Sequence, residues 1–80
     1  MTTKAFVLIE TAVGKTREVS NALQNVEGMK SVDAVTGPYD IIAIMEADDL
    51  NTIGNAVTSK VHTVNGVVRT VTCLALGFPQ

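Results

Sequence analysis

The 80-residue sequence predicts a single α+β domain, residues 1–80, with the element order βαββαβ. Apolar runs of strand length alternate with segments in which apolar residues recur at helical spacing, and turn residues separate them. The two halves of the chain also resemble each other. This combination predicts the ferredoxin-like fold, a four-stranded antiparallel sheet with two helices on one face.

The first half of the chain reads as strand, helix and strand. Lys4–Thr11 contains a continuous apolar run that indicates a buried strand. After a break at Gly14, a helix is predicted that stops at Gly28. Met29–Thr36 alternates between apolar and polar residues, as expected of a half-buried strand. The apolar residues at helical spacing are Val19, Ala22, Leu23 and Val26.

The second half repeats this order. Tyr39–Ala47 is a strongly apolar strand, and Asp48 and Asp49 are placed to cap the helix that follows. Gly66 closes the unit, and Val67–Leu76 is the last strand. The expected apolar stripe of this helix is Leu50, Ile53, Val57 and Val61. The repeat is also visible in matching motifs, Val26-Glu27-Gly28-Met29 against Val64-Asn65-Gly66-Val67 and Leu8-Ile9-Glu10 against Ile44-Met45-Glu46.

Composition excludes several classes of protein. With 46% hydrophobic and 18% charged residues, the chain is too apolar for disorder. A net charge of −2 and six scattered basic residues argue against direct nucleic-acid binding. The one cysteine excludes an internal disulfide and suits a reducing compartment. No apolar run is long enough to span a membrane and no signal-peptide pattern is present, so a cytoplasmic protein is expected.

Apolar residues occur on both faces of the predicted strands. In the first strand, Phe6 and Leu8 point one way while Val7 and Ile9 point the other. Two helices cover only one face, so the other face leaves a large apolar patch of the kind that marks an interaction surface. Covering several hundred Å² would supply roughly 10 kcal/mol before association costs. We therefore expect an isologous dimer in which two sheets pack face to face.

Two segments carry the candidate functional residues. Thr36-Gly37-Pro38-Tyr39-Asp40 is a turn with free backbone N–H groups beside a single acid. Gly66-Val67-Val68-Arg69-Thr70-Val71-Thr72 places two threonine hydroxyls on the same side of a strand. Amides, an acid and hydroxyls suit the binding of a small zwitterion better than bond-breaking chemistry.

These two segments, in this order and fold, resemble the effector domain of the Lrp/AsnC regulator family, also called the RAM domain (regulation of amino-acid metabolism). The resemblance spans Lys4–Leu76 and implies a non-catalytic domain that senses free amino acids and needs no cofactor or metal. It also implies a homodimer of the dimeric α/β-barrel type and higher rings, octamers or decamers. The implied ligand-binding residues are Gly37, Pro38 and Tyr39 lining a cleft between subunits, Asp40 on the ligand ammonium, and Thr70 and Thr72 on its polar end.

The sequence departs from full-length members of the family because it has no helix-turn-helix domain before the first strand. It resembles the stand-alone versions, which do not contact an operator themselves. Such a chain would co-assemble with full-length Lrp/AsnC regulators or only bind the amino acid. A domain excised from a longer protein would look the same.

Each candidate residue also has an ordinary structural explanation. Asp40 is suited to brace the turn, and Thr70 and Thr72 are good strand formers without any ligand. Tyr39 is suited to pack its ring at a subunit boundary. An enzyme on this fold would need a nucleophile–base pair, and the early turn offers little beyond Lys15. A structural oligomer that mixes with full-length regulators remains the main alternative.

Six other residues have structural interpretations. The acidic cluster of Glu46, Asp48 and Asp49 is explained by helix capping. His62 lies near the end of the second helix, where a cation interacts well with the helix dipole. Cys73 is expected to be an inert core residue. Gly54, inside the second helix, is expected to allow close packing against the sheet.

Overall fold

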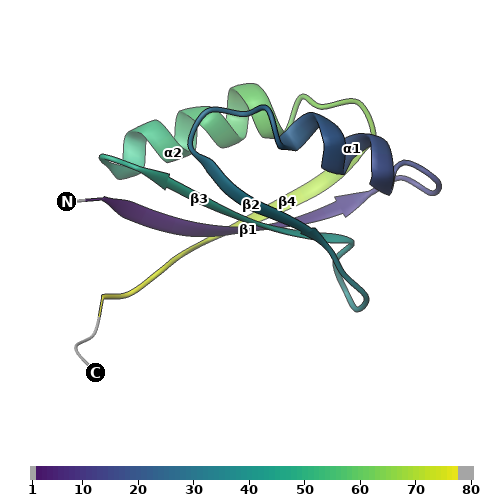
Figure 1. Ribbon diagram of the computed structural model, residues 1–80, viewed down its shortest axis with the longest axis horizontal. Helices are drawn as coiled ribbons and strands as arrows, with labels where there is room; N and C mark the ends of the chain where they lie inside the picture. The colour runs from purple at the N-terminus through teal and green to yellow at the C-terminus, as the bar shows by residue number, and fades with distance from the viewer. Residues whose placement is uncertain (1, 78–80) are drawn as a thin grey trace.

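A computed structural model describes residues 2–77 of the chain (Figure 1). Met1, with which the chain begins, lies outside the described residues. The element order confirms the predicted βαββαβ arrangement. The elements are β1 (Thr3–Thr11), α1 (Thr16–Leu23), β2 (Met29–Ala34), β3 (Ile41–Ala47), α2 (Leu50–Ala56), a π-helical segment η1 (Val57–Val61) and β4 (Val67–Leu74).

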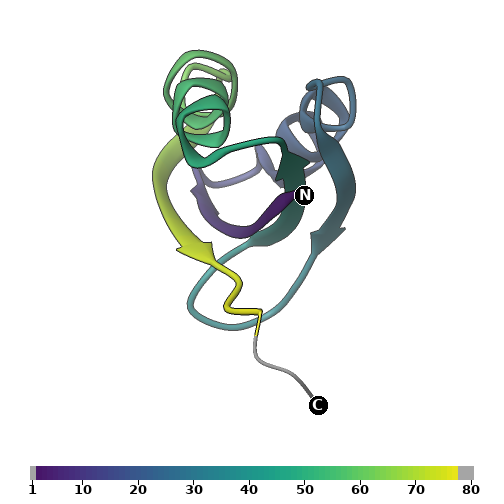
Figure 2. The same cartoon turned by 90° about the vertical axis from the view of Figure 1, so that its left-hand side faces the viewer.

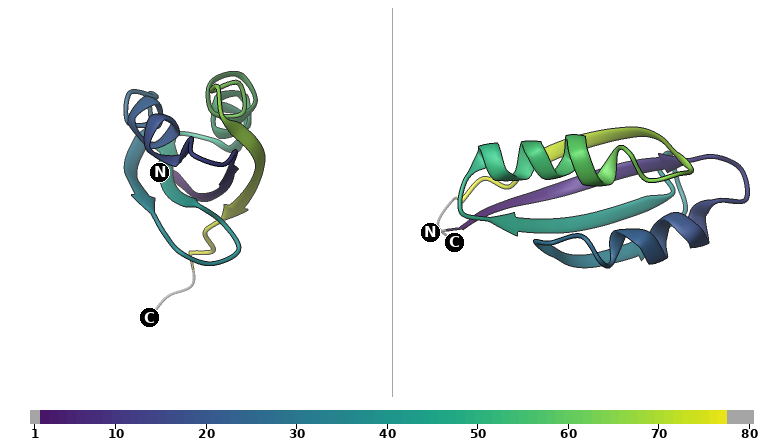
Figure 3. Two further views of the ribbon diagram at one scale, coloured as in Figure 1. Left: turned by 90° about the vertical axis from the view of Figure 1, so that its right-hand side faces the viewer. Right: turned by 90° about the horizontal axis from the view of Figure 1, so that it is seen from above.

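The strands form one antiparallel sheet in the order β2-β3-β1-β4. The central strand β1 therefore lies between the two strands of the second half, and Ile9 pairs with Ile41 on one side and Thr70 on the other. Both helices lie over the same face of the sheet (Figures 2 and 3). Among the described residues, no helix combines the length and the apolar character that crossing a membrane requires.

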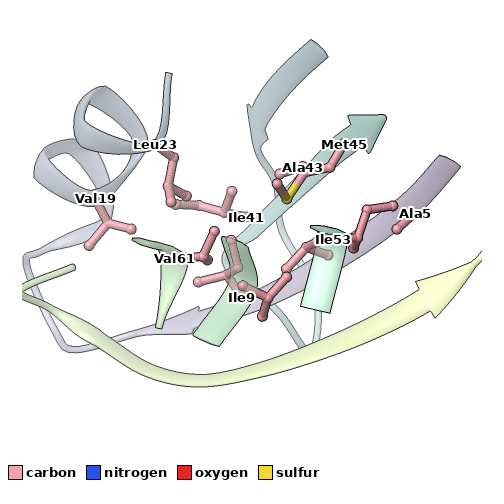
Figure 4. Close-up of a cluster of buried hydrophobic side chains, with 11 residues drawn as sticks. Ala5, Ile9, Val19, Leu23, Ile41, Ala43, Met45, Ile53 and Val61 are labelled. Carbon is pink, nitrogen blue, oxygen red and sulfur yellow. The ribbon is translucent and has the colours of Figure 1, made fainter. Parts of the chain in front are cut away.

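The core fills the space between the helices and the sheet (Figure 4). It uses alternate residues of the two central strands, such as Val7 in β1 and Ala43 in β3, as the period of a strand dictates. Val19 and Leu23 enter it from α1, and Ile53 enters it from α2. No polar side chain is buried among the described residues, so this core depends on apolar packing alone.

The other face of the sheet carries the intervening residues. Phe6 pairs with Ile44 and Cys73, and Leu8 pairs with Ile42 and Val71, so these side chains share one side of the sheet. No helix covers this side (Figure 2). We call it the open face, made by Phe6, Leu8, Ile42, Ile44, Val71 and Cys73. The sequence left undecided whether Phe6 or Val7 faces outward, and the structure places Phe6 on the open face and Val7 in the core.

The matching glycines of the two halves share the same backbone conformation and the same kind of hydrogen bond. Gly28 and Gly66 have φ of 90° and 103°, a conformation that favours glycine. Each carbonyl accepts a hydrogen bond from a strand or its end, Gly28 from Glu46 N at 2.9 Å and Gly66 from Ala12 N at 2.8 Å. The internal repeat seen in the sequence is therefore also a repeat of backbone geometry.

Four strand boundaries differ from the prediction, and the first is the start of β1, which lies at Thr3 rather than Lys4. β2 ends at Ala34 rather than Thr36, and β3 begins at Ile41 rather than Tyr39. The reason is a loop over residues 35–40, closed by a hydrogen bond of 2.9 Å from Val35 N to Asp40 O. β4 ends at Leu74 rather than Leu76, although Ala75 N still donates a hydrogen bond of 2.9 Å to Lys4 O of β1.

Several burial predictions were wrong. Leu50 is 53% exposed at the start of α2, and Ala22 is exposed on α1. Gly54 does not pack against the sheet, because a Cβ built there has no atom within 4 Å. Cys73 is exposed rather than in the core, because it lies on the open face. The second helix also ends in a wider turn than expected, with His62 N donating to Val57 O at 2.7 Å.

Candidate ligand-binding site

The predicted site residues lie towards one end of the sheet, where β1 ends and where β3 and β4 begin (Figure 1). The turn requires glycine at Gly37, whose φ of 126° is strained for other residues. Thr70 pairs with Ile9 near this end, and Thr72 pairs with Val7, two residues away from Ile9 in β1. The fold therefore places the turn and the threonines on opposite sides of β1.

Asp40 is held firmly in its own chain. Its carboxylate Oδ2 accepts a hydrogen bond of 2.8 Å from Thr11 N, and its backbone nitrogen donates to Ile9 O at 2.9 Å. Asp40 N is therefore not a free donor. The carboxylate braces the turn, and no contact among the described residues occupies its Oδ1.

Tyr39 is paired with Arg69, a residue that was not among the predicted site residues. Arg69 Nη2 donates a hydrogen bond of 3.1 Å to the Tyr39 hydroxyl. The guanidinium carbon also lies 5.8 Å from the centre of the tyrosine ring, within the range of a cation–π interaction. The sequence offered one signal for Arg69, a positive charge next to Thr70 in the segment that also holds Thr72. Its contact with Tyr39 could not be predicted, because that contact depends on the register of the strands.

The two threonines face the helix side of the sheet. They pair with Ile9 and Val7, which are both fully buried on that side. Thr70 is half-buried and Thr72 is exposed, and the prediction that both point the same way is confirmed. Arg69 occupies the alternate position, opposite Glu10, so it faces the open side. Within one chain, the threonines and the Tyr39–Arg69 pair therefore lie on opposite faces of the sheet.

A groove among the described residues lies elsewhere. It has a volume of about 450 Å³ and lies beside α2 and the turn at Gly28. Its lining includes Glu27, Gly28, Met45, Ile53, Ser59 and Lys60 and none of the six predicted site residues. In the single chain, Gly37, Pro38 and Thr72 are exposed, and the other three candidate residues are half-buried.

The element order, the sheet order and the placement of both helices on one face define a ferredoxin-like domain. Within this class, the chain matches the profile described as the Lrp/AsnC ligand binding domain over residues 4–79. The chain therefore belongs to the Lrp/AsnC ligand-binding domain family. The resemblance drawn from the turn and the last strand is confirmed.

Solved structures agree with this assignment. TTHA0845 from Thermus thermophilus is 32% identical, with a TM-score of 0.91 over 98% of this chain and 99% of that chain. The hypothetical protein PHS023 from Pyrococcus horikoshii is 34% identical, with a TM-score of 0.85 over 95% and 90% of the two chains. No curated protein matches the sequence.

A longer chain shares the fold at lower identity. The transcriptional regulator NMB0573 from Neisseria meningitidis, solved as a complex with L-Met, is 20% identical with a TM-score of 0.83. The similarity covers 92% of this chain and 49% of that regulator. The present chain thus corresponds in fold to about half of the regulator.

Proposed function

We propose that this chain is a non-catalytic regulatory module that binds a free amino acid in the cytoplasm. It would act on the transcription of genes of amino-acid metabolism through full-length Lrp/AsnC regulators. The observation that carries the proposal is the match to a ligand-binding domain over residues 4–79. The L-Met complex of NMB0573 supports an amino acid as the class of ligand.

The chemistry of the turn supports the same ligand class. Asp40 supplies an acid for the ligand ammonium, and Gly37, Pro38 and Tyr39 surround it with backbone groups and a phenol. Thr70 and Thr72 face the other side of the sheet. In the proposed site, the threonines of one chain therefore complete the polar surface around the turn of another. Such a site forms only after assembly, which fits the exposed position of the turn in the single described chain.

The proposed assembly begins with a homodimer joined through the open face. Phe6, Leu8 and Ile44 lie on a side of the sheet that no helix covers, although apolar groups gain by leaving water. A second copy offers the same surface, so a two-fold arrangement buries both faces at once. Further association into rings such as octamers or decamers would bring the turns and threonines of neighbouring dimers together.

A second function is a structural oligomer that mixes with full-length regulators without binding a ligand. This alternative would rest on mixing of subunits through the domain that the chain shares in fold with NMB0573. The Asp40 carboxylate also has a structural partner in Thr11 N. Both functions use the same assembly, and they differ in whether an amino acid stabilises the protein.

The experiment that tests the proposal is a thermal-shift screen of the purified protein against each proteinogenic amino acid at millimolar concentration. A ligand at a hundred times its Kd adds about 2.7 kcal/mol to the stability of the native state. A dose-dependent rise in Tm with one or a few amino acids is expected. If the folded protein responds to none of them, amino-acid binding is wrong and the subunit-mixing function takes its place.

A further inference from the structure

We infer that Arg69 is the residue that binds the α-carboxylate of the amino-acid ligand. The inference rests on the proposed function and assigns one charge of the ligand to one side chain. An amino acid carries a carboxylate and an ammonium on the same carbon, so a cation near an acid would complement both charges. Asp40 supplies the acid, and neither the turn nor the threonines supplies a cation.

Over residues 2–77, no carboxylate forms an ion pair within 4.0 Å of the Arg69 guanidinium, although Glu10 is its neighbour across the strands. The ion pair in this part of the chain joins Lys15 and Glu18. The close partner of Arg69 is the Tyr39 phenol, which is neutral, at 3.1 Å. The guanidinium has five N–H donors in a planar fork, and one of them is bound to Tyr39. The remaining donors suit a carboxylate, which accepts two parallel hydrogen bonds from such a fork.

The fold brings this cation close to Asp40. Arg69 pairs with Glu10, while Asp40 is bonded to the backbone of Ile9 and Thr11 on the other side of β1. The two backbones are thus about 10 Å apart, which is two strand spacings. The arginine side chain spans part of this distance, because its guanidinium reaches the hydroxyl of Tyr39, the residue next to Asp40. Glu10 on β1 lies between the two strands in the register. Acid and cation then flank one small region at the end of the sheet.

Tyr39 gains a definite role in this arrangement. Its hydroxyl oxygen accepts the hydrogen bond from Arg69, and its ring lies below the guanidinium. These two contacts fix the orientation of the fork without cancelling its charge. The hydroxyl proton remains free to donate to the same carboxylate. The threonines offer only neutral hydroxyls, and charge-assisted hydrogen bonds are roughly twice as strong as neutral ones.

The test compares an amino acid with its own carboxamide in wild-type protein and in Arg69→Gln. L-Methionine and L-methioninamide are the first pair, and the amino acid with the largest shift in the thermal screen replaces methionine if methionine does not bind. Affinities are measured by titration calorimetry at a pH well below about 7.7, the pKa of an α-amino group next to an amide, so that both ligands carry the ammonium. Lys30→Gln is the matched control, because it removes the same charge from an exposed residue near the opposite end of the sheet.

Wild-type protein and Lys30→Gln are expected to prefer the acid over the amide by about tenfold or more. Arg69→Gln should bind both ligands about equally, and Arg69→Lys should retain part of the preference because it keeps the charge without the fork. Tyr39→Phe should weaken the preference through the loss of the hydroxyl that orients Arg69. A purely structural role for Arg69 would lower both affinities together and leave their ratio unchanged.

The outcomes separate this assignment from the proposed function. If Arg69→Gln keeps the wild-type preference for the acid, Arg69 does not bind the carboxylate, although the amino-acid site stands. If wild-type protein binds no proteinogenic amino acid, the proposed function and this assignment fail together. If Arg69→Gln does not fold, the test uses Arg69→Lys and Tyr39→Phe instead. If both of these variants keep the full wild-type preference for the amino acid over its carboxamide, the assignment is overturned.

Discussion

The carboxylate of Asp40 accepts a hydrogen bond from the backbone nitrogen of Thr11, with Oδ2 and N 2.8 Å apart. The bond ties the loop that precedes β3 to the last residue of β1. Because Thr11 is partly buried, its N–H would lack a partner without this carboxylate. One side chain therefore serves the fold and, in the proposed function, also faces the ligand.

Asp40→Asn and Asp40→Ala separate these two roles. Asn keeps an oxygen acceptor for Thr11 N and loses the charge, so its stability should stay close to that of wild type. Ala should lower the free energy of unfolding by about 1–3 kcal/mol. For a domain of this size, that corresponds to a fall in Tm of about 4–8 °C for each kcal/mol. Thermal unfolding measures the first role, and calorimetric titration with the amino acid measures the second.

Asp40→Asn should fold normally and lose most of its amino-acid binding. Unchanged affinity in this variant would remove Asp40 from the ligand site and leave it as a turn brace. An Asp40→Ala variant as stable as wild type would show instead that the Thr11 bond contributes little.

Phe6→Lys should convert the proposed oligomer into folded monomers, because it places a charge in the middle of the open face. Val13→Lys is the matched control, since Val13 is 102% exposed in a loop and its replacement should leave the oligomer intact. Light scattering coupled to size exclusion gives the mass, and circular dichroism confirms folding. A Phe6→Lys variant with the wild-type oligomeric mass would overturn the sheet-to-sheet dimer.

Cys73 provides an independent readout of the same interface. It is the one cysteine in the chain and lies on the open face opposite Phe6. A thiol reagent should therefore react slowly with the assembled wild-type protein and quickly with the Phe6→Lys monomer. Equal labelling rates in the two proteins would mean that assembly leaves this face uncovered.

Gly28→Ala and Gly54→Ala should change stability in opposite directions. At Gly28, φ is 90° and a Cβ would lie 2.9 Å from the backbone oxygen of Glu46, so alanine should destabilise by more than about 1 kcal/mol. At Gly54, within α2, a Cβ meets open space, and alanine should stabilise by about 1 kcal/mol. Denaturant unfolding measures both, and a destabilised Gly54→Ala would reveal packing that the chain forms only in its assembly.

Asp49 should contribute to stability in a way that depends on pH. Hydrogen bonds from the backbone and side chain of Thr52 lower the pKa of Asp49 below its usual value of 3.8. A lowered folded-state pKa means that the contribution is complete above the unfolded-state pKa and is lost as the pH falls through the folded-state pKa. Asp49→Ala should therefore have a lower Tm than wild type near pH 7. The difference should shrink below about pH 4.

Asp48→Ala is the control for this measurement, because Asp48 precedes the capping residue and makes no described hydrogen bond to the helix. Its Tm should follow that of wild type across the pH range. A constant difference between wild type and Asp49→Ala from neutral to acidic pH would show that charge is not part of the cap.

The sequence was sufficient to predict the order of strands and helices, because each of these elements is marked by residues close together in the chain. The spacing of Val19 and Leu23 identified a helix, and Gly28 and Gly66 marked its end and that of its counterpart. Burial at single positions was harder to predict. Leu50 and Gly54 fit a helical pattern, but which face meets the sheet depends on how α2 docks. Cys73 has apolar neighbours in the sequence, yet the absence of a helix on its side of the sheet decides its exposure.

The candidate site could be predicted only in part. The turn residues stood out because Gly37 and Pro38 interrupt two apolar strands. The contacts of Tyr39 with Arg69, and of Asp40 with Thr11, join residues far apart in the chain. They follow from the register of β1 with its two neighbours, and composition and spacing carry no information about that register.

The strand order has a consequence for folding. β1 and β2 are not neighbours in the sheet, and neither are β3 and β4, so every strand pair joins one half of the chain to the other. A fragment ending in the loop after β2 would contain no paired strand, and the complementary fragment would contain none either. We expect both fragments to be unfolded alone and to recover the sheet only when they are mixed. The loop at Gly37 is thus a natural position at which to split the protein into two complementing pieces.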